Sequence, residues 1–375
     1  MQEETIREQI GQRLLEARNA LGLSQEKAAA LLDVHRNVLH EWEAGKKLAT
    51  IKDLRKAAEI YDRDIAFFTS KKEEDAFTVL LRTVRQDKAV YERAINFEKF
   101  CSNFKRLCQV LEYQNNVPVV PDYTIDQSRP LTEWMAHYAE QARDLLGLGR
   151  GPITNLREVL ETKLHLKIYF ETLPDAVSGI FTYSQSIGGS IMINTQNRTP
   201  GHQHFSLAHE FAHFLFHRSL CALVSSKNNS SAKEETEADL FAEHFLMPTQ
   251  AIRDSFYDRA KGDISEEDVL YLADLYRVSF KAMTYRLKTL KLINQATADM
   301  LFEDTKVSML REISGFQEPP INNEKFPKVY VHLLVKAYRQ KRITASALSD
   351  YLDVDLWSAR QEAKKFESLV EHASG

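Results

Sequence analysis

Cysteine, long apolar runs and excess positive charge are all scarce in this 375-residue chain. Three cysteines, an odd number, exclude a disulfide-stabilised scaffold and fit a reducing compartment. No apolar run approaches the roughly 18 residues that span a bilayer. The first residues, MQEETIREQI, lack the basic start and apolar core of a signal peptide. The net charge of −4 gives no general attraction to nucleic acid, and we expect a cytoplasmic protein that does not contact a membrane.

The length and composition indicate a globular protein of several domains. With 43% hydrophobic and 27% charged residues, the chain is long enough for two or three separate cores. A charged stretch, FTSKKEED, and a later one with three prolines, NNVPVVPDYTIDQSRP, interrupt the helical patterns. We expect a small helical domain, a helical linker region, a domain of mixed secondary structure and a helical C-terminal region, at residues 1–70, 71–130, 131–255 and 256–375.

A change of period marks the third of these parts. The segments HLKIYFETL, VSGIFTYS and GSIMINTQ are rich in β-branched and aromatic residues and are separated by turn formers, which predicts three strands. Helical patterns lie on both sides of them, and a polar loop at 225–235 separates two of the helices. The predicted fold class is mainly α, with a small β-sheet in one α+β domain.

The stretch FSLAHEFAHFLFH, residues 205–217, carries the clearest chemistry. His209 and His213 are four residues apart, so in a helix they share one face and can direct nitrogens at one ion. Glu210 lies beside them, near enough to a metal-bound water to take its proton. His217 continues the stripe, but one straight helix cannot bring three turns to one small ion. We therefore expect His217 to pack or to form a hydrogen bond.

A catalytic zinc ion needs three protein ligands and one open position, so a third ligand must come from another segment. The acidic segment EETEADLFAEHFLMP supplies the candidates. Glu235 and Asp239 are four residues apart, which favours Glu235 as the ligand and Asp239 as the carboxylate that orients a ligating histidine. Glu237 is the alternative ligand. Two imidazoles and one carboxylate favour Zn²⁺ over manganese or iron.

These motifs, with VSGIFTYSQSIGGSIMINTQN upstream, resemble the ImmA/IrrE family of bacterial and phage metallopeptidases over residues 135–255. The resemblance implies a thermolysin-like zincin fold, in which a small sheet lies beside the His-Glu-x-x-His helix. It implies His209, His213 and Glu235 as zinc ligands and Glu210 as the catalytic general base. Known members of the family cleave helix-turn-helix repressors in stress responses or during the induction of mobile elements.

The first part of the chain resembles the Xre/Cro-type helix-turn-helix family, through LGLSQEKAAALLDVHRNVLHEWEAGKK. In such modules the first turns of the recognition helix reach base edges in the major groove, while basic residues beside it contact phosphate. The resemblance implies DNA-contacting residues at Gln25, Arg36, Asn37, His40 and Lys46, with Lys47 beside the last.

The lack of net positive charge in this module weighs against DNA as its partner. Residues 1–70 contain 11 lysines and arginines against 12 aspartates and glutamates. Glu41 lies inside the proposed recognition helix, where it repels phosphate unless it points away. The alternative is a module that pairs with another helix-turn-helix domain. A second such unit is expected in TASALSDYLDVDLWSARQEAKKF, where Asp353 and Asp355 make the first turn acidic and favour a protein contact.

The sequence thus predicts a cytoplasmic zinc-dependent endopeptidase and transcriptional regulator that cleaves a helix-turn-helix repressor. Its expected partners are DNA, which such modules commonly bind as a homodimer, and the repressor itself. The alternative is a DNA-binding repressor or antitoxin-like protein whose peptidase-like domain senses or holds a partner without cleaving it. Three residues are candidates for stabilising the oxyanion of the peptidase reaction: Tyr183, Tyr285 and His244.

Overall fold

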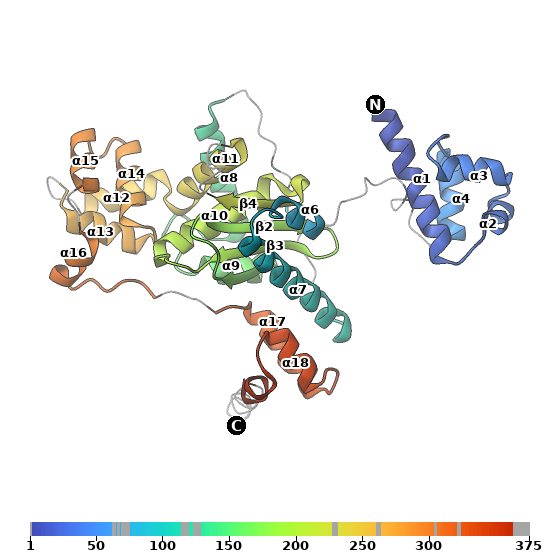
Figure 1. Cartoon of the computed structure of the whole chain (residues 1–375). Helices are drawn as coiled ribbons and strands as arrows, with labels where there is room; N and C mark the ends of the chain where they lie inside the picture. Colours follow the sequence, from blue (N-terminus) through green and yellow to red (C-terminus); the bar gives the residue numbers. More distant parts are fainter. Residues whose placement is uncertain are drawn as a thin grey trace. The chain divides into compact units, whose positions relative to one another are not determined.

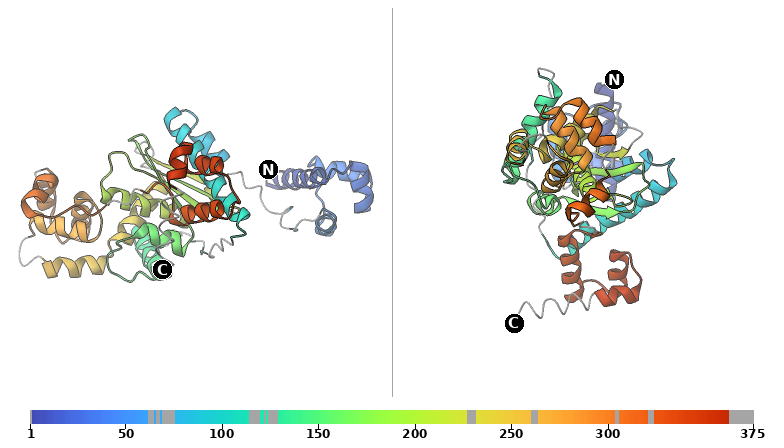
Figure 2. Two further views of the ribbon diagram at one scale, coloured as in Figure 1. Left: turned by 90° about the horizontal axis from the view of Figure 1, so that it is seen from below. Right: turned by 90° about the vertical axis from the view of Figure 1, so that its left-hand side faces the viewer.

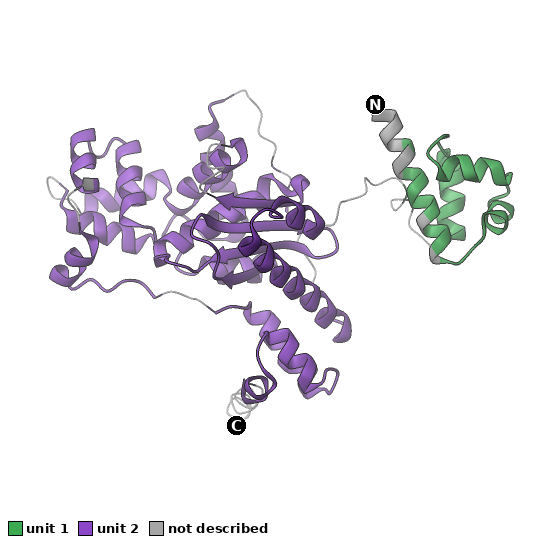
Figure 3. Cartoon of the chain, viewed as in Figure 1, with its two compact units in different colours: residues 1–74 green, residues 75–375 purple. Residues whose placement is uncertain are grey.

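The computed structural model describes residues 2–61, 65, 68, 76–113, 120–121, 123, 129–226, 232–259, 264–303, 306–320 and 324–362. The chain forms two compact units, residues 1–74 and 75–375 (Figure 3). Residues 69–75 of the expected polar boundary, and most of the proline-containing connector, lie outside the described residues. The finer division of the chain into four parts stays a prediction.

The described part of the first unit is helical (Figure 1). Its helices are α1 (Gln2–Ala20), α2 (Gln25–Leu32), α3 (Arg36–Glu43) and α4 (Ile51–Ile60). Ser24 caps α2 by accepting a hydrogen bond from the backbone amide of Lys27, and Thr50 forms a capping box with Asp53 at the start of α4. Asp33 ends α2 in the left-handed conformation and turns the chain into α3. The helix-turn-helix expected from the sequence is confirmed.

The core of the first unit forms where α1 crosses α3. Leu14 of α1 and Trp42 of α3 are buried there. A Cβ atom on Gly11 would lie 2.2 Å from the Trp42 carbonyl oxygen, so glycine allows an approach that no other residue permits. A buried ion pair also joins the two helices, with Arg18 Nε 2.6 Å from Oε1 of Glu43.

Within its described residues, the second unit contains one four-stranded sheet of order β1-β3-β2-β4. The strands are β1 (Lys167–Glu171), β2 (Val177–Ser184), β3 (Gly188–Asn194) and β4 (Ala222–Ser226). Strand β1 runs parallel to β3, and β2 is antiparallel to both β3 and β4. The three expected strands are present. Strand β4 corrects the expectation of a polar loop at Ser225 and Ser226, because pairing with β2 sets the conformation of these residues despite their polarity.

Successive residues of the strands enter two different cores, one on each face of the sheet. Phe181 and Ile191 belong to the first core, and their neighbours Ile180 and Met192 belong to the second. The first core includes residues of α8 (Leu131–Leu146), α9 (Leu156–Lys163), α10 (Pro200–Phe216) and α11 (Lys233–Leu246), and it continues into several of the shorter helices given below. Those that contribute to the second core are α6 (Ala76–Thr83), α7 (Lys88–Val110), α17 (Lys328–Arg339) and α18 (Ala345–Leu352).

Helices α7 and α17, from opposite ends of the second unit's sequence, lie side by side (Figures 1 and 2). The ring centroids of Phe100 and Tyr330 are 5.1 Å apart, and Tyr169 of β1 stacks on Phe100 at 5.0 Å. The segment expected as a helical linker thus shares a core with the sheet and with the C-terminal helices.

The remaining helices are short. They are η1 (Arg218–Leu220), α12 (Thr249–Arg259), α13 (Glu266–Leu275), α14 (Phe280–Thr289), α15 (Gln295–Glu303) and α16 (Val307–Ser314). The protein is mainly α-helical with one small sheet in the described part, as the sequence predicts. Among the described helices, none combines the length and apolar character needed to cross a membrane.

Candidate metal centre

The three residues expected to bind metal come together where α10 packs against α11. His209 and His213 lie one turn apart on α10, and their Nε2 atoms are 3.2 Å apart. Glu235, in the first turn of α11, places Oε2 3.4 Å from Nε2 of His209 and Oε1 3.5 Å from Nε2 of His213. All three residues are buried, and their ligand atoms lie within 4.8 Å of one another. The arrangement can therefore hold one metal ion.

The second ring nitrogen of each histidine has its own partner. His209 Nδ1 lies 2.8 Å from Oδ1 of Asp239. His213 Nδ1 lies 2.9 Å from Nδ1 of His217, whose Nε2 lies 3.0 Å from Oε2 of Glu237. All of these contacts are satisfied if His209 and His213 carry a proton on Nδ1 and His217 carries a proton on Nε2. Both remaining Nε2 lone pairs are then free to bind an ion.

The two candidate carboxylates of α11 point to different partners. Glu235 faces the paired Nε2 atoms, whereas Glu237 contacts His217. Residues two apart on a helix lie on different sides, which explains why one carboxylate cannot replace the other. His217 forms a hydrogen bond as expected, and it connects His213 to Glu237.

Glu210 is fully buried beside the histidines, with 0% of its surface exposed. A Cβ atom on Gly179 of β2 would lie 2.4 Å from its Oε1. The hydroxyl of Ser225, on β4, lies 3.3 Å from Nε2 of His213. Ser225 also lies close enough to Glu210 to favour its ionised form. Burial raises the pKa of Glu210 to about 8, and a carboxyl group with such a pKa can accept and release a proton near neutrality.

The candidate ligands differ in their protonation. Burial opposes the charged form of His209, but Asp239 and Glu235 more than compensate and raise its pKa to about 10. Burial lowers the pKa of His213 to about 4. Burial likewise opposes ionisation of Glu235, but hydrogen bonds with both histidines lower its pKa to about 2. Protonation and metal binding therefore compete at His209.

Two neighbours of the centre were not identified from the sequence. Gly179 had a usable signal, because an isolated glycine within a strand pattern often marks a close approach. Ser225 had none, because its strand was not expected.

The DNA-contacting candidates lie on α2, on α3 and just after α3. Four of them are exposed in the first unit: Arg36, Asn37, His40 and Lys46. The side chain of Gln25 instead donates a hydrogen bond to the buried carboxylate of Glu43, at 2.8 Å. Glu41 is also exposed. DNA contact by these residues stays a prediction.

The three candidates for stabilising the oxyanion lie in different surroundings. His244 accepts a hydrogen bond at Nδ1 from Arg286, at 3.1 Å. The guanidinium of Arg218 lies over the ring of Tyr183, 5.8 Å from its centroid. Tyr285 is 49% exposed. Their role stays a prediction.

The fold and the cluster of His209, His213 and Glu235 together define a class of protein. Its members join a helix-turn-helix module to a metallopeptidase-like domain. Comparison with known families agrees with this description. Residues 14–68 match the helix-turn-helix family model, and residues 161–288 match the model of the IrrE N-terminal-like domain, a peptidase family. The chain thus matches an Xre-type helix-turn-helix domain and then an IrrE/ImmA-like peptidase domain, in the order that the sequence predicts.

Two curated relatives match over a longer stretch. Both are described as HTH-type transcriptional regulator RamB, from the CDC 1551 / Oshkosh and ATCC 25618 / H37Rv strains of Mycobacterium tuberculosis. Each is 24% identical to this chain over 324 residues, which cover 75% of this chain and 65% of the relative. The chain thus spans about two thirds of the length of these regulators.

Proposed function

We propose that this protein is a zinc-dependent endopeptidase that acts in transcriptional regulation by cleaving a helix-turn-helix repressor. One observation carries the proposal: His209, His213 and Glu235 present their ligand atoms within 4.8 Å of one another, next to the buried carboxylate of Glu210. Two imidazoles and a carboxylate, with one coordination place left open, form the ligand set of a catalytic zinc site.

The residues fit such an ion. The two oxygens of the buried Glu235 lie 3.4 Å and 3.5 Å from Nε2 of His209 and of His213, so a cation between these atoms would bind one oxygen and two nitrogens. When bound, zinc would lower the pKa of a water molecule and polarise a carbonyl group. In this proposal, Glu210 would hold a proton taken from water and return it to the leaving amine. Asp239 and the His217–Glu237 pair would fix the orientation of the two imidazoles.

The first unit supplies the regulatory half of the proposal. Its recognition helix α3 exposes Arg36, Asn37 and His40, which are residue types that read base edges. Attachment to the peptidase would raise the local concentration of a promoter-bound substrate to the order of millimolar for a suitable tether. The relatives, described as transcriptional regulators, support a role at a promoter.

Metal analysis and substrate identification test the proposal together. Purified protein is expected to contain about one zinc ion per chain, and Glu235→Gln is expected to reduce that content. In cells, wild-type protein is expected to create a new N-terminus in a helix-turn-helix protein. Glu210→Gln is expected to keep its zinc and to create no new N-terminus. Wild type without a transition metal, or cleavage equal in the two forms, contradicts the proposal.

A second candidate function is that of a regulator that binds and never cleaves. Two observations favour it: the relatives are described as transcriptional regulators, and the Ser225 hydroxyl lies 3.3 Å from the nitrogen that His213 would offer to a metal. Under this alternative, a promoter reporter responds equally to wild type and Glu210→Gln, and the bound partner is recovered intact.

A further inference from the structure

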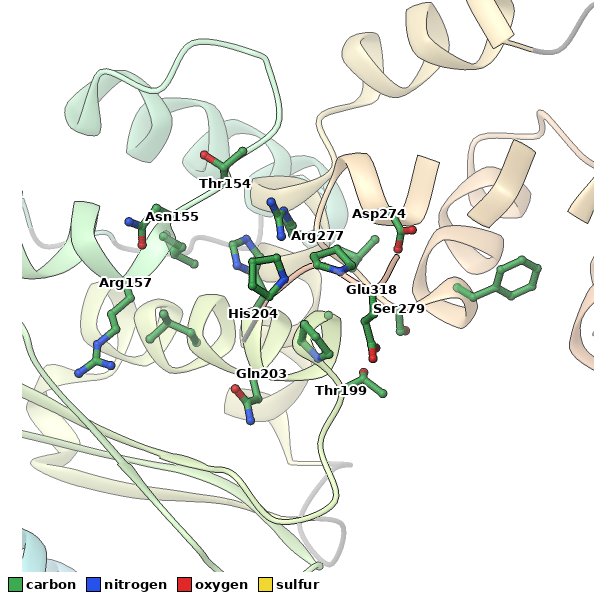
Figure 4. A pocket seen from close by; sticks show the side chains of 18 of the residues that line it. Thr154, Asn155, Arg157, Thr199, Gln203, His204, Asp274, Arg277, Ser279 and Glu318 are labelled. Carbon is green, nitrogen blue, oxygen red and sulfur yellow. The ribbon is translucent and has the colours of Figure 1, made fainter. Parts of the chain in front are cut away.

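The second unit contains a cavity of about 330 Å³ whose lining does not include the candidate metal ligands. Its walls come from β1, the start of α9, the start of α10, the turn between α13 and α14, and α16 with the segment after it. Asn155 lies on one side and Ser279 on the other, with His204 and Arg277 between them (Figure 4). A volume near 300 Å³ is typical of small-molecule sites.

Two buried polar groups that line this cavity lack partners. Gln203 is 5% exposed, and its Nε2 has no hydrogen-bond partner in the described part of the chain. Nε2 of His204 is equally buried and unpaired among the described residues. Burial lowers the pKa of His204 to about 4, with a further contribution from the charge of Arg277, so the ring is neutral at ordinary pH. Because unpaired buried polar groups are costly, each one calls for an explanation such as a ligand.

Arg277 supplies a cationic side chain to the cavity. Its backbone amide donates a hydrogen bond to the carbonyl oxygen of Asp274, but no described residue forms a hydrogen bond or an ion pair with its guanidinium group. It has left-handed backbone geometry, φ 56°, in the turn between α13 and α14. Turns of the same kind follow α2 and α18, where the left-handed residues are Asp33 and Asp353. In all three turns the left-handed residue is followed by a valine. Of these three left-handed residues, Arg277 is the one that is cationic, and it lines the cavity.

Three helix N-termini also line the cavity. The capping residues Asn155, Thr199 and Ser279, which begin α9, α10 and α14, are all part of its lining. Free backbone amides and the positive end of the helix dipole favour an anion at such positions. The acidic residues nearby do not cancel this preference: Asp274 is paired with Arg311 at 2.6 Å, and Glu318 is exposed.

The rest of the lining is largely apolar. Phe170, Leu207, Phe280 and the consecutive prolines Pro319 and Pro320 contribute to it. From this combination we propose that the cavity binds a small organic anion, with its phosphate or carboxylate group at Arg277 and Nε2 of His204 and its apolar body against Phe280 and the two prolines. The proposal goes beyond the peptidase activity and depends on none of its residues.

Isothermal titration of the purified full chain tests the site with three probes: phenyl phosphate, benzoate and the uncharged benzyl alcohol. We expect at least one of the two anions to bind, and benzyl alcohol to bind at least tenfold more weakly than that anion. Arg277→Asn removes the charge but keeps a residue that tolerates left-handed geometry, and it is expected to weaken anion binding at least tenfold.

A matched control is available in the same unit. Lys291 is also a cation with left-handed geometry, φ 57°, but it is exposed and does not line the cavity. Lys291→Asn and Glu210→Gln are both expected to bind the anion as wild type does, and melting curves of all variants establish that they are folded. Failure of both anions to bind, equal binding of benzyl alcohol, or an equal loss in Lys291→Asn overturns the proposal. Anion binding retained by a cleavage-deficient Glu210→Gln separates this site from the proposed peptidase function.

Discussion

Gly179 on β2 faces the carboxylate of Glu210 so closely that a Cβ atom there would lie 2.4 Å from Oε1 and 2.8 Å from Cγ. Glu210 has 0% exposure, so its side chain has little free space into which it could move. The strand and the helix thus meet at a glycine because a carboxylate occupies the space of its missing side chain. This relationship fixes the position of the proposed general base.

Gly179→Ala is therefore expected to displace the Glu210 carboxylate. Cleavage of an identified substrate should fall by about a hundredfold, because a misplacement near 1 Å is that costly in an active site. The free energy of unfolding should fall by about 1–3 kcal/mol through overpacking. Gly189→Ala is the control, since its Cβ would meet Phe214 at 2.6 Å. It should lose stability but retain most of its activity, and equal losses of activity in the two variants would show that Glu210 is not the group affected.

The His217–Glu237 pair is expected to support metal affinity through His213. Glu237→Gln weakens the acceptor of the His217 proton, and supporting residues of this kind typically change metal affinity by 10–100-fold. Competition with a chromophoric chelator measures that affinity directly. Glu234→Gln, a neighbouring carboxylate of the same helical turn, should leave it unchanged. An unaltered zinc affinity in Glu237→Gln would remove the pair from the centre.

Stability should decline in acid through His244. Burial, and secondarily the charge of Arg286, lower the pKa of this histidine to about 4, so between pH 6.5 and 4 the unfolded chain binds a proton that the folded chain does not. Folding therefore weakens as the pH falls through this window, by on the order of 1–3 kcal/mol. In His244→Asn the amide oxygen can accept the Arg286 hydrogen bond without titrating. Chemical denaturation at pH 7 and pH 4.5 should show a smaller pH dependence for this variant, and identical dependence would contradict the assignment.

In the first unit, base contacts and phosphate contacts should respond differently to mutation. Once an operator is identified, Asn37→Ala should cost about 1–3 kcal/mol on that sequence and little on unrelated DNA. Lys46→Ala should weaken binding to all sequences alike and reduce the slope of log affinity against log salt by about 1. Fluorescence anisotropy at several salt concentrations measures both effects. If neither variant changes DNA affinity, the module pairs with protein instead.

Much of this fold could be predicted because its signals are local. The caps at Ser24 and Thr50, and the β-rich stretches that became β1, β2 and β3, each depend on a few consecutive residues. Strand β4 could not be predicted, because its conformation depends on pairing with a strand about 40 residues earlier in the chain. The packing of α7 beside α17 is equally non-local.

The sequence by itself determined that His209 and His213 share one face of a helix, because their spacing matches one helical turn. It also narrowed the third ligand to a short acidic segment. Only the tertiary structure shows that Glu235 and not Glu237 faces the paired nitrogens, because the packing of α11 against α10 sets the direction of each carboxylate. The tertiary structure also brings the starts of α9, α10 and α14 around one cavity. Contacts between distant segments depend on how the helices and strands assemble, which no short stretch of the chain encodes.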